Sequence, residues 1–295
     1  MKILLLGKNG QVGWELQRSL SPLGELVALG SAECDLTDLA ALTATLRDIA
    51  PDVIVNAAAY TAVDKAESEP ELARLINAGA LAVLAQQATE LNAWLIHYST
   101  DYVFDGGGDT PWAETDLTGP LNVYGESKLD GERNIVQSGC RHLIFRTSWV
   151  YGARGGNFAR TMLRLAQERD VLRVIDDQIG APTGADLIAD VTAHALRKAI
   201  RHPEVFGLYH LAAGGETSWH GYAGFVLDCA RSAGVALKAS EICAVPTSAF
   251  PTPARRPHNS RLNTEKLQNT FDLHPPHWKA GVERMLIEVL EKQHD

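Results

Sequence analysis

A glycine-rich turn near the N-terminus constrains the fold of this chain more than any other feature. Residues 2–6 form a short apolar run, and residues 11–20 carry their apolar side chains on one helical face. Gly7, Gly10 and Gly13 lie between them with the spacing GxxGxxG. Glycines permit a tight turn and close approach of the backbone to a phosphate, and a helix N-terminus attracts a pyrophosphate. The segment therefore predicts a strand–turn–helix unit that binds a dinucleotide.

Apolar runs and amphipathic segments alternate through the first half of the chain. The expected strands are residues 2–6, 26–29, 53–57, 94–99 and 143–147. The expected helices are residues 11–20, 39–49 and 71–91. Strands that alternate with helices form right-handed βαβ units and a parallel sheet covered on both faces. We therefore expect an α/β fold with a Rossmann-like, doubly wound parallel sheet.

The second half is less regular and predicts a smaller C-terminal lobe. Its expected helices are residues 157–168, 186–200, 220–233 and 282–292, and its expected strands are residues 172–175 and 208–211. Prolines at four positions make residues 245–261 an ordered loop. We expect residues 1–152 to form mainly an NAD(P)-binding Rossmann domain. Residues 153–295 are expected to form mainly a substrate-binding lobe, with some segments returning to the first domain.

The composition narrows the class of protein. The 295 residues carry 36 acidic and 27 basic side chains, a formal net charge of −9. This charge argues against nucleic-acid binding, which usually needs a basic face. No stretch approaches the roughly 20 apolar residues of a membrane span, and residues 1–6 are too short for the core of a signal peptide. With four scattered cysteines and no CxxC spacing, we expect a cytoplasmic protein with reduced thiols and no membrane partner.

The end of the second expected strand bears on the choice of cofactor. A carboxylate about 20 residues after the first strand would bind the adenosine ribose of NAD. Leu29, Gly30 and Ser31 stand at that point, with neither a carboxylate nor an arginine among them. The missing carboxylate favours NADPH, with NADH also accepted. Asp35 and Leu36 follow closely; Asp35 either contacts the adenine or caps the next helix.

Tyr124 and Lys128 are spaced as YxxxK, which places both on one face of a helix. A free tyrosine titrates near about 10, and a lysine ammonium one turn away favours the phenolate and lowers the pKa. The same ammonium can hold ribose hydroxyls. Thr100 follows the fourth expected strand, where ligands of parallel sheets bind, so its hydroxyl is expected near the substrate oxygen. The alternative is a surface tyrosine, a solvated lysine and a polar strand end.

Seven segments together resemble the extended, sugar-nucleotide branch of the short-chain dehydrogenase/reductase superfamily, and within it the dTDP-4-dehydrorhamnose reductase family. The segments are residues 7–20, 53–71, 97–104, 120–128, 145–152, 177–184 and 251–263, and the resemblance covers nearly the whole chain. The last two are more specific than the superfamily signature. The resemblance implies NAD(P)H-dependent reduction of the C4 ketone of dTDP-4-dehydro-L-rhamnose to dTDP-L-rhamnose.

The resemblance also implies roles for single residues. Tyr124 donates the proton, Lys128 orients the nicotinamide ribose, and Thr100 hydrogen-bonds the reacting oxygen. The other residues implied in cofactor binding are Gly7, Gly10, Gln11, Val12, Gly13, Asp35, Leu36, Ala59, Tyr60, Thr61 and Tyr98. Those implied in substrate binding are Thr61, Thr100, Asp101 and Trp149. Arg255 and Arg256 are candidates for the dTDP phosphates, because arginine pairs with phosphate in a bidentate manner; the alternative is a solvated basic pair.

A homodimer with an acidic magnesium site is a further implication of the resemblance. Glu15, Asp186 and Glu288 are the candidate ligands, because magnesium favours oxygen donors. Solvated surface carboxylates are the alternative.

Two other functions stay open. The first is an extended reductase or epimerase that acts on a different nucleotide sugar, which fits the glycine turn and YxxxK equally well. Only residues 177–184 and 251–263 distinguish such an enzyme from a dTDP-4-dehydrorhamnose reductase. The second is a non-catalytic regulatory subunit, since a fold does not dictate a function. Thr100, Tyr124 and Lys128 together argue against a binding-only protein.

Overall fold

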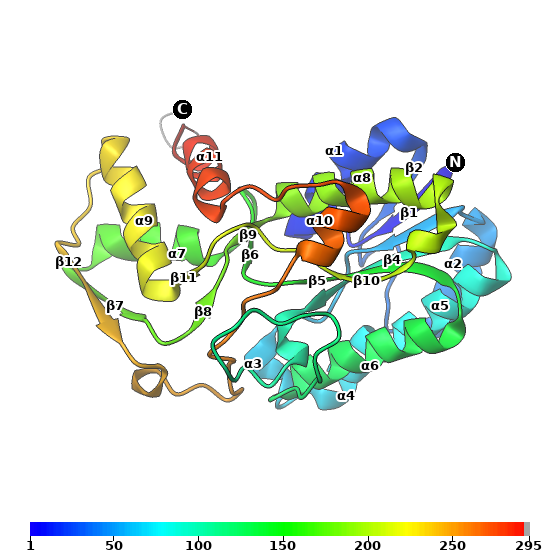
Figure 1. Cartoon of the computed structure of the whole chain (residues 1–295), viewed down its shortest axis with the longest axis horizontal. Coiled ribbons are helices and arrows are strands. Elements are labelled where there is room, and N and C mark those ends of the chain that lie inside the picture. Colours follow the sequence, from blue (N-terminus) through cyan, green and yellow to red (C-terminus); the bar gives the residue numbers. More distant parts are fainter. Residues whose placement is uncertain (292–295) are drawn as a thin grey trace.

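A six-stranded parallel sheet lies at the centre of the larger part of the molecule (Figure 1). The structure is a computed structural model that describes residues 1–291. The strands run in the order β2-β1-β3-β4-β5-β10, and all pair in parallel. Their bounds are β1 (Lys2–Leu6), β2 (Glu25–Leu29), β3 (Val53–Asn56), β4 (Trp94–Thr100), β5 (Arg141–Thr147) and β10 (Gly207–His210). The predicted Rossmann-like fold is confirmed.

Helices cover both faces of this sheet (Figure 1). One face carries α1 (Gln11–Leu20), α8 (Ala185–Arg201) and α10 (Glu265–Phe271), and the other carries α2 (Leu39–Ile49), α5 (Ala80–Glu90) and α6 (Val123–Ser138). The apolar side chains of β1 pack on both faces of the sheet, because successive side chains of a strand point to opposite faces. Leu5 packs in the cluster of Leu16 from α1, and Leu4 packs in the cluster of Leu42 from α2.

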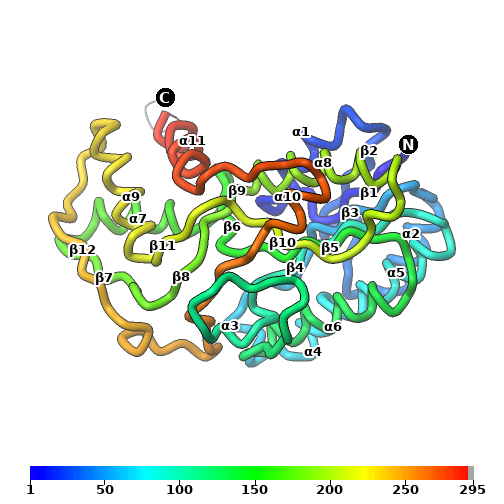
Figure 2. Tube along the Cα trace, viewed as in Figure 1, coloured from blue at the N-terminus to red at the C-terminus, as the bar shows by residue number. Residues whose placement is uncertain are grey.

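A smaller lobe has its own apolar core. Its helices are α7 (Phe158–Glu168), α9 (Trp219–Ser232) and α11 (Trp278–Glu291). Its strands pair as β7 (Val171–Ile175) with β12 (Glu241–Val245), β8 (Ile179–Gly180) with β11 (Thr217–Ser218), and β6 (Val150–Tyr151) with β9 (Thr183–Gly184). The core includes Met162, Leu227 and Leu286. Figure 2 shows that the chain returns to the sheet after β9, because α8, β10 and α10 pack there.

Short elements connect these parts, and one of them breaks a predicted helix. They are η1 (Ser21–Leu23), α3 (Val63–Ala66), α4 (Pro70–Arg74), the π-helical η2 (Leu75–Gly79), η3 (Asp101–Val103), η4 (Pro203–Val205) and η5 (Thr247–Ala249). The helix predicted over residues 71–91 is therefore divided into α4, η2 and α5. Asn77 in η2 explains the division, because its buried amide bonds the Tyr60 backbone at 2.9 and 3.0 Å and the Ser127 hydroxyl at 3.0 Å.

The predicted elements also differ at the C-terminal end. Sequence reasoning missed β12 and α10, and the loop predicted from residue 245 begins with the last residue of β12. The last helix begins at Trp278 rather than residue 282, because the Trp278 N–H donates to the Gly214 carbonyl at 2.9 Å and its ring is buried. Lys292, the predicted end, lies outside the described residues. Within residues 1–291, no helix has the length and apolar character to cross a membrane.

Candidate active site

A cavity of about 620 Å³ opens at the carboxyl ends of β1, β3 and β4. Ligands of open α/β sheets bind at such ends, where crossovers leave neighbouring strands in opposite directions. The predicted site residues that line it are Gly7, Gly10, Gln11, Val12, Asp35, Leu36, Ala59, Thr61, Tyr98, Thr100, Asp101, Tyr124, Lys128 and Trp149. Fourteen positions spread from residue 7 to residue 149 are thus brought together in one cavity.

The glycine turn has the close approaches that its spacing predicts. Gly7 has a φ of +85°, and a Cβ there would lie 2.7 Å from the Ala58 amide nitrogen. A Cβ on Gly13 would collide with the Gly7 carbonyl, so Gly13 brings α1 against β1 and does not line the cavity. Helix α1 follows Gly10 with no side-chain cap, which leaves its first N–H groups available to an anion.

Tyr60 also lies outside the cavity lining. Its hydroxyl donates to the Glu69 carboxylate at 2.6 Å, and this bond raises the pKa of Tyr60 to about 12. Its backbone is bound by Asn77. The side chain therefore stabilises the segment after β3, while its neighbours Ala59 and Thr61 border the cavity.

Tyr124 and Thr100 meet in the buried part of the cavity. The side-chain amide of Asn122 caps α6 by accepting from the Gly125 N–H at 2.8 Å, which fixes the turn that carries Tyr124. Burial raises the pKa of Tyr124, and a hydrogen bond with the Thr100 hydroxyl opposes this rise. A tyrosine in this state is a phenol that can release a proton to a stronger base beside it.

Lys128 is 2% exposed and points to β4. Its Nζ donates to the Tyr98 carbonyl at 2.6 Å and lies 3.0 Å from Nε2 of His97. Burial lowers the pKa of Lys128 to about 7, against the opposite effect of Glu132. The predicted lowering of the Tyr124 pKa by Lys128 is not found in this arrangement, where burial dominates and the charge of Asp101 raises the Tyr124 pKa further.

Two residues beside this group were missed by sequence reasoning. His97 is fully buried on β4, and burial together with the Lys128 charge holds its pKa well below the usual range. Tyr102 lies edge-on to Tyr124, with ring centres 5.5 Å apart. Both belong to the segment 97–104 that carried the resemblance. Their proximity to Thr100 in the sequence was the available signal.

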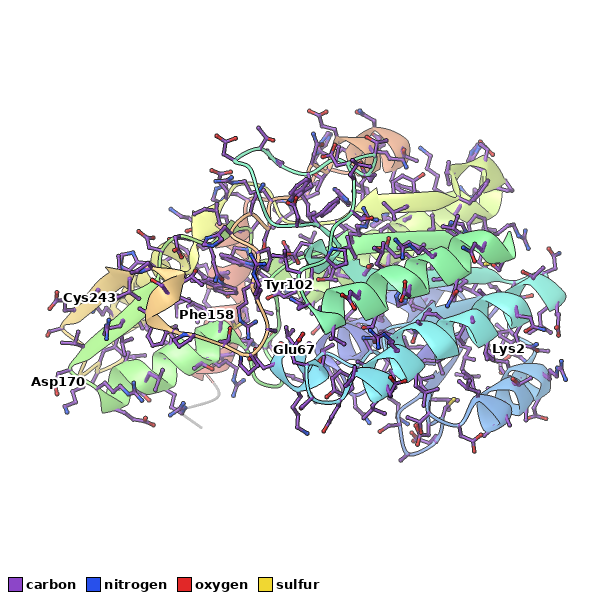
Figure 3. The ribbon with its side chains drawn as sticks, turned by 90° about the horizontal axis from the view of Figure 1, so that it is seen from below. Lys2, Glu67, Tyr102, Phe158, Asp170 and Cys243 are labelled. Carbon is purple, nitrogen blue, oxygen red and sulfur yellow. The ribbon has the colours of Figure 1, made fainter. Side chains whose placement is uncertain are left out.

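A second cavity of about 290 Å³ adjoins the first and has several aromatic side chains in its walls. Trp149 and Tyr102 line both cavities. Trp149 stacks on Trp219 with ring centres 3.6 Å apart, and Phe158 and Phe250 also line the cavity. Figure 3 shows Tyr102 between the helices that cover the sheet and the lobe, where Phe158 lies. This cavity suits a flat ring attached to a polar group.

The two predicted phosphate-binding arginines are separated. Arg256 lines the second cavity, where its guanidinium bonds Asp64 at 2.7 Å and the Tyr102 hydroxyl at 3.2 Å. Arg255 is exposed and borders neither cavity, and its carbonyl accepts from Asn122 at 2.8 Å. Of these two arginines, Arg256 is the one positioned to reach a ligand that spans the two cavities.

The end of β2 corrects an expectation from the sequence. No carboxylate was expected there, but the Glu33 side chain folds back so that one of its oxygens accepts from the Gly30 N–H at 2.8 Å. Residues 30, 31, 34 and 35 border the cavity at this point. The fold of the turn after β2 therefore places the Glu33 carboxylate at the end of the strand, although no acidic residue stands there in the sequence.

The three predicted magnesium ligands surround an arginine. Arg284 forms an ion pair with Asp186, and the charges of Glu15 and Glu288 further raise the pKa of this guanidinium. Among residues 1–291, no group of three or more His, Cys, Asp or Glu side chains is arranged to hold a metal ion. The arrangement of one protomer therefore does not fit magnesium, because a guanidinium takes the place of the cation.

Comparison with known proteins identifies the family. A family model described as RmlD substrate binding domain matches residues 1–291. The chain is 62% identical over 293 residues to dTDP-4-dehydrorhamnose reductase of Salmonella typhimurium, covering 98% of each chain. A crystal structure of a dTDP-4-dehydrorhamnose reductase from Clostridium acetobutylicum has a TM-score of 0.88 at 34% identity, covering 99% of this chain and 100% of that one.

A second solved structure bears on the cofactor. The dTDP-4-dehydrorhamnose reductase of Bacillus anthracis, in complex with NADP, has a TM-score of 0.88 at 33% identity and covers 97% of this chain and 99% of that one. The full-length match and the identities leave no doubt about ancestry. The chain belongs to the dTDP-4-dehydrorhamnose reductase family.

Proposed function

We propose that the chain reduces the C4 ketone of dTDP-4-dehydro-L-rhamnose to dTDP-L-rhamnose at the expense of NADPH. The observation that carries the proposal is the meeting of Thr100, Tyr124 and Lys128 at one cavity with the glycine turn. The relatives named above support the assignment of the substrate, since their similarity extends over nearly the whole chain. A non-catalytic subunit would not need these three side chains together.

Reduction of a ketone needs a hydride at carbon and a proton at oxygen. NADPH supplies the hydride when it is bound. Tyr124 gives its hydroxyl proton to the developing alkoxide, and Thr100 orients that hydroxyl through their hydrogen bond. Lys128, with its Nζ at the end of β4, would donate to the nicotinamide ribose. The sum of the two transfers converts the carbonyl to an alcohol.

The cavity suggests how the remaining residues share the ligands. Gly7, Gly10, Gln11 and Val12 would hold the cofactor pyrophosphate at the start of α1. We assign the diphosphate of the sugar nucleotide to Arg256 and its base to the aromatic cavity that Trp149 borders. Thr61 and Asp101 would contact the sugar. Under this proposal the sheet binds mainly the cofactor, and the lobe binds mainly the nucleotide.

A homodimer stays a proposal that rests on the family resemblance. A cytoplasmic location stays a proposal that rests on the composition, and use of NADH stays one that rests on the residues that follow β2. Light scattering of the purified protein tests the dimer, with twice the mass of 32.0 kDa as the expected value. Magnesium has no support in the contacts of Glu15, Asp186 and Glu288, and no step of the reaction is assigned to it.

Loss of NADPH absorbance with a panel of keto sugars tests the substrate. We expect kcat/KM for dTDP-4-dehydro-L-rhamnose to exceed that for UDP- or GDP-linked keto sugars by at least about tenfold, the effect of roughly one extra hydrogen bond to a charged group. A higher kcat/KM for a UDP- or GDP-linked keto sugar would contradict the proposed dTDP-sugar substrate. No oxidation of NADPH with any of them would reject the reductase assignment.

A further inference from the structure

A buried histidine of β4 lies against the side chain of Lys128, and the proposed mechanism gives this histidine no part. His97 is fully buried, and its Nε2 lies 3.0 Å from Lys128 Nζ. Lys128 is 2% exposed. A buried charge is costly unless hydrogen-bond partners surround it. The groups that face Lys128 Nζ therefore decide how firmly this lysine keeps its proton.

Two neighbouring residues of β4 offer acceptors to the Lys128 ammonium. The Tyr98 carbonyl accepts from Nζ at 2.6 Å, a short distance of the kind that a charged donor makes. His97 presents Nε2 from the position before it. A lysine ammonium has three N–H donors and no acceptor. With two donors directed to β4, the third can point into the 620 Å³ cavity, which Lys128 lines.

The nearest carboxylate on the same helix is committed to another partner. Glu132 lies one turn beyond Lys128 on α6, and its charge raises the pKa of Lys128. Both oxygens of Glu132 accept from the guanidinium of Arg146 on β5, at 2.9 and 2.6 Å. Glu132 therefore acts on Lys128 through its charge, while His97 is the side chain that contacts the ammonium directly.

The remaining titratable groups near Lys128 lie toward the cavity. Tyr124 is one turn before Lys128 on α6, and Asp101 follows β4. The Thr100 hydroxyl donates to Asp101 Oδ1 at 3.2 Å, and burial raises the pKa of Asp101 to about 6. These groups face the reacting side of the site, whereas His97 lies on the sheet side of Lys128 Nζ.

Asn56 of β3 faces the other nitrogen of the His97 ring. A hydrogen bond with the Asn56 backbone raises the pKa of His97, but burial and the Lys128 charge hold it well below the usual range, so the ring is neutral. A neutral imidazole has one N–H and one acceptor nitrogen. With the proton on Nδ1, the lone pair of Nε2 faces Lys128. In the opposite tautomer, Nδ1 accepts from Asn56 Nδ2 at 3.3 Å and Nε2–H requires an uncharged Lys128.

We propose that His97 is a positioning residue for Lys128: its neutral ring accepts a hydrogen bond from the ammonium, holds the proton on Nζ and, with the Tyr98 carbonyl, directs the third N–H to the nicotinamide ribose. The ribose contact rests on the proposed function, while the bond between the two side chains is a property of the free protein. Without His97, the buried ammonium has one acceptor fewer and releases its proton at a lower pH.

NMR titration of Lys128 in the full chain tests this bond without a cofactor or a sugar. Lysine labelled with a carbon isotope at Cε gives a signal for each residue, and Lys128→Met identifies that of Lys128. We expect His97→Leu to lower the titration midpoint of Lys128 by about one pH unit or more, a roughly tenfold loss of proton affinity, as for loss of one hydrogen bond to a charged group. His97→Gln places an amide oxygen near the position of Nε2 and should restore most of the midpoint.

His142→Leu is the matched control. His142 is a buried histidine of β5 whose Nδ1 lies 2.8 Å from the Cys140 carbonyl, and it borders neither cavity, so its replacement should leave the Lys128 midpoint unchanged. If His97→Leu does not fold, His97→Asn takes its place, because this shorter side chain faces Asn56 but does not reach Lys128. An unchanged midpoint in the His97 variants would reject the bond. A raised midpoint would show the opposite tautomer, and either result overturns the proposal.

The pH profile of the reaction distinguishes positioning from structural support. We expect the fall of kcat/KM for NADPH toward high pH to move to lower pH in His97→Leu, by the same amount as the NMR midpoint, and to return in His97→Gln. Loss of activity by one constant factor at every pH would overturn the positioning role. A shifted midpoint in a protein that reduces no dTDP-keto sugar would reject the proposed function and keep the bond. Normal reduction with an unshifted midpoint would do the reverse.

Discussion

At the residue scale, the centre of the site consists of titratable groups that burial holds toward their uncharged forms. Burial raises the pKa of Tyr124, lowers that of Lys128 to about 7, and raises that of Asp101 to about 6. In a medium of low dielectric, each of these groups responds strongly to a charge placed nearby. A bound anionic ligand is therefore expected to shift the pKa values of Tyr124, Lys128 and Asp101.

Asp101 gives a pH-dependent prediction for stability. Its carboxyl is 2% exposed, and burial raises its folded-state pKa from 3.8 to about 6, partly offset by the hydrogen bond that the Thr100 hydroxyl donates at 3.2 Å. Because the folded-state pKa is the higher one, the native state holds the proton more tightly, and stability is lost as pH rises from about 4 through about 6. The loss in the free energy of unfolding over this range is on the order of 3 kcal/mol, and Asp101→Asn should remove it.

Chemical denaturation of both proteins between pH 4 and pH 7 measures this effect. The free energy of unfolding of Asp101→Asn should rise relative to that of the unchanged protein up to about pH 6 and then level off. A difference that stays constant over this range would show that Asp101 is not buried as a charged group.

The residues that sequence reasoning found and missed differ in how they reach the cavity. Tyr124 and Lys128 are four residues apart on one helix, so local spacing was enough to pair them. Glu33 reaches the end of β2 only because its turn folds back to the Gly30 amide, which depends on tertiary structure. His97 was missed because no sequence spacing links a histidine in a strand to its partner. That partner, Lys128, lies on another element, the helix α6.

At the scale of elements, the packing of α6 on η2 sets the position of Tyr124 and Lys128. Gly131, one turn beyond Lys128, lies directly against the Asn77 carbonyl in η2, and a Cβ there would collide with it. Asn77 in turn bonds Ser127 on the same helix. A glycine at this point lets α6 approach closely enough for Tyr124 and Lys128 to reach the end of β4.

Replacement of this glycine tests the contact. Gly131→Ala should destabilise the protein by about 2 kcal/mol and lower kcat, because α6 must move away from η2. Gly224→Ala is the matched control, since Gly224 lies in α9 with no atom near its Cβ position. The control should be neutral or stabilise by up to about 1 kcal/mol. Urea denaturation distinguishes the two; equal effects would contradict the packing role.

The sheet was predictable from sequence because strands buried on both faces are continuous apolar runs. Residues 2–6 and 53–56 are such runs, and they became β1 and β3. The π-helical η2 was not predictable, since its cause is the bonding of Asn77 to Tyr60 and Ser127, far along the chain. β12 was missed because it is only partly buried and pairs with a single strand, β7.

At the scale of the whole molecule, the site exists only because the lobe meets the sheet. Arg256, from the proline-rich loop, bonds Asp64 of α3, and the Ala254 amide donates to the same carboxylate at 3.3 Å. These contacts bring the aromatic cavity of the lobe beside the cavity of the sheet. Under the proposed function, a sugar nucleotide that binds across both parts would place its reacting carbon near Tyr124.

Arg256→Met tests this assignment. We expect KM for the dTDP-sugar to rise about tenfold or more, with KM for NADPH little changed, because one charge-assisted contact with the diphosphate is lost. Arg255→Met is the matched control: this neighbouring arginine is exposed and borders neither cavity, so both KM values should stay within about twofold. Equal effects of the two variants on KM would contradict the assignment of the diphosphate to Arg256.

The central claim is that Tyr124 delivers the proton to the C4 oxygen while a nicotinamide cofactor delivers the hydride. Steady-state reduction of dTDP-4-dehydro-L-rhamnose by the Tyr124→Phe variant, measured together with NADPH binding, tests it most directly. We predict a loss of kcat of at least about a hundredfold with NADPH affinity nearly unchanged, since only the proton donor is removed. Turnover at the rate of the unchanged protein would contradict the claim.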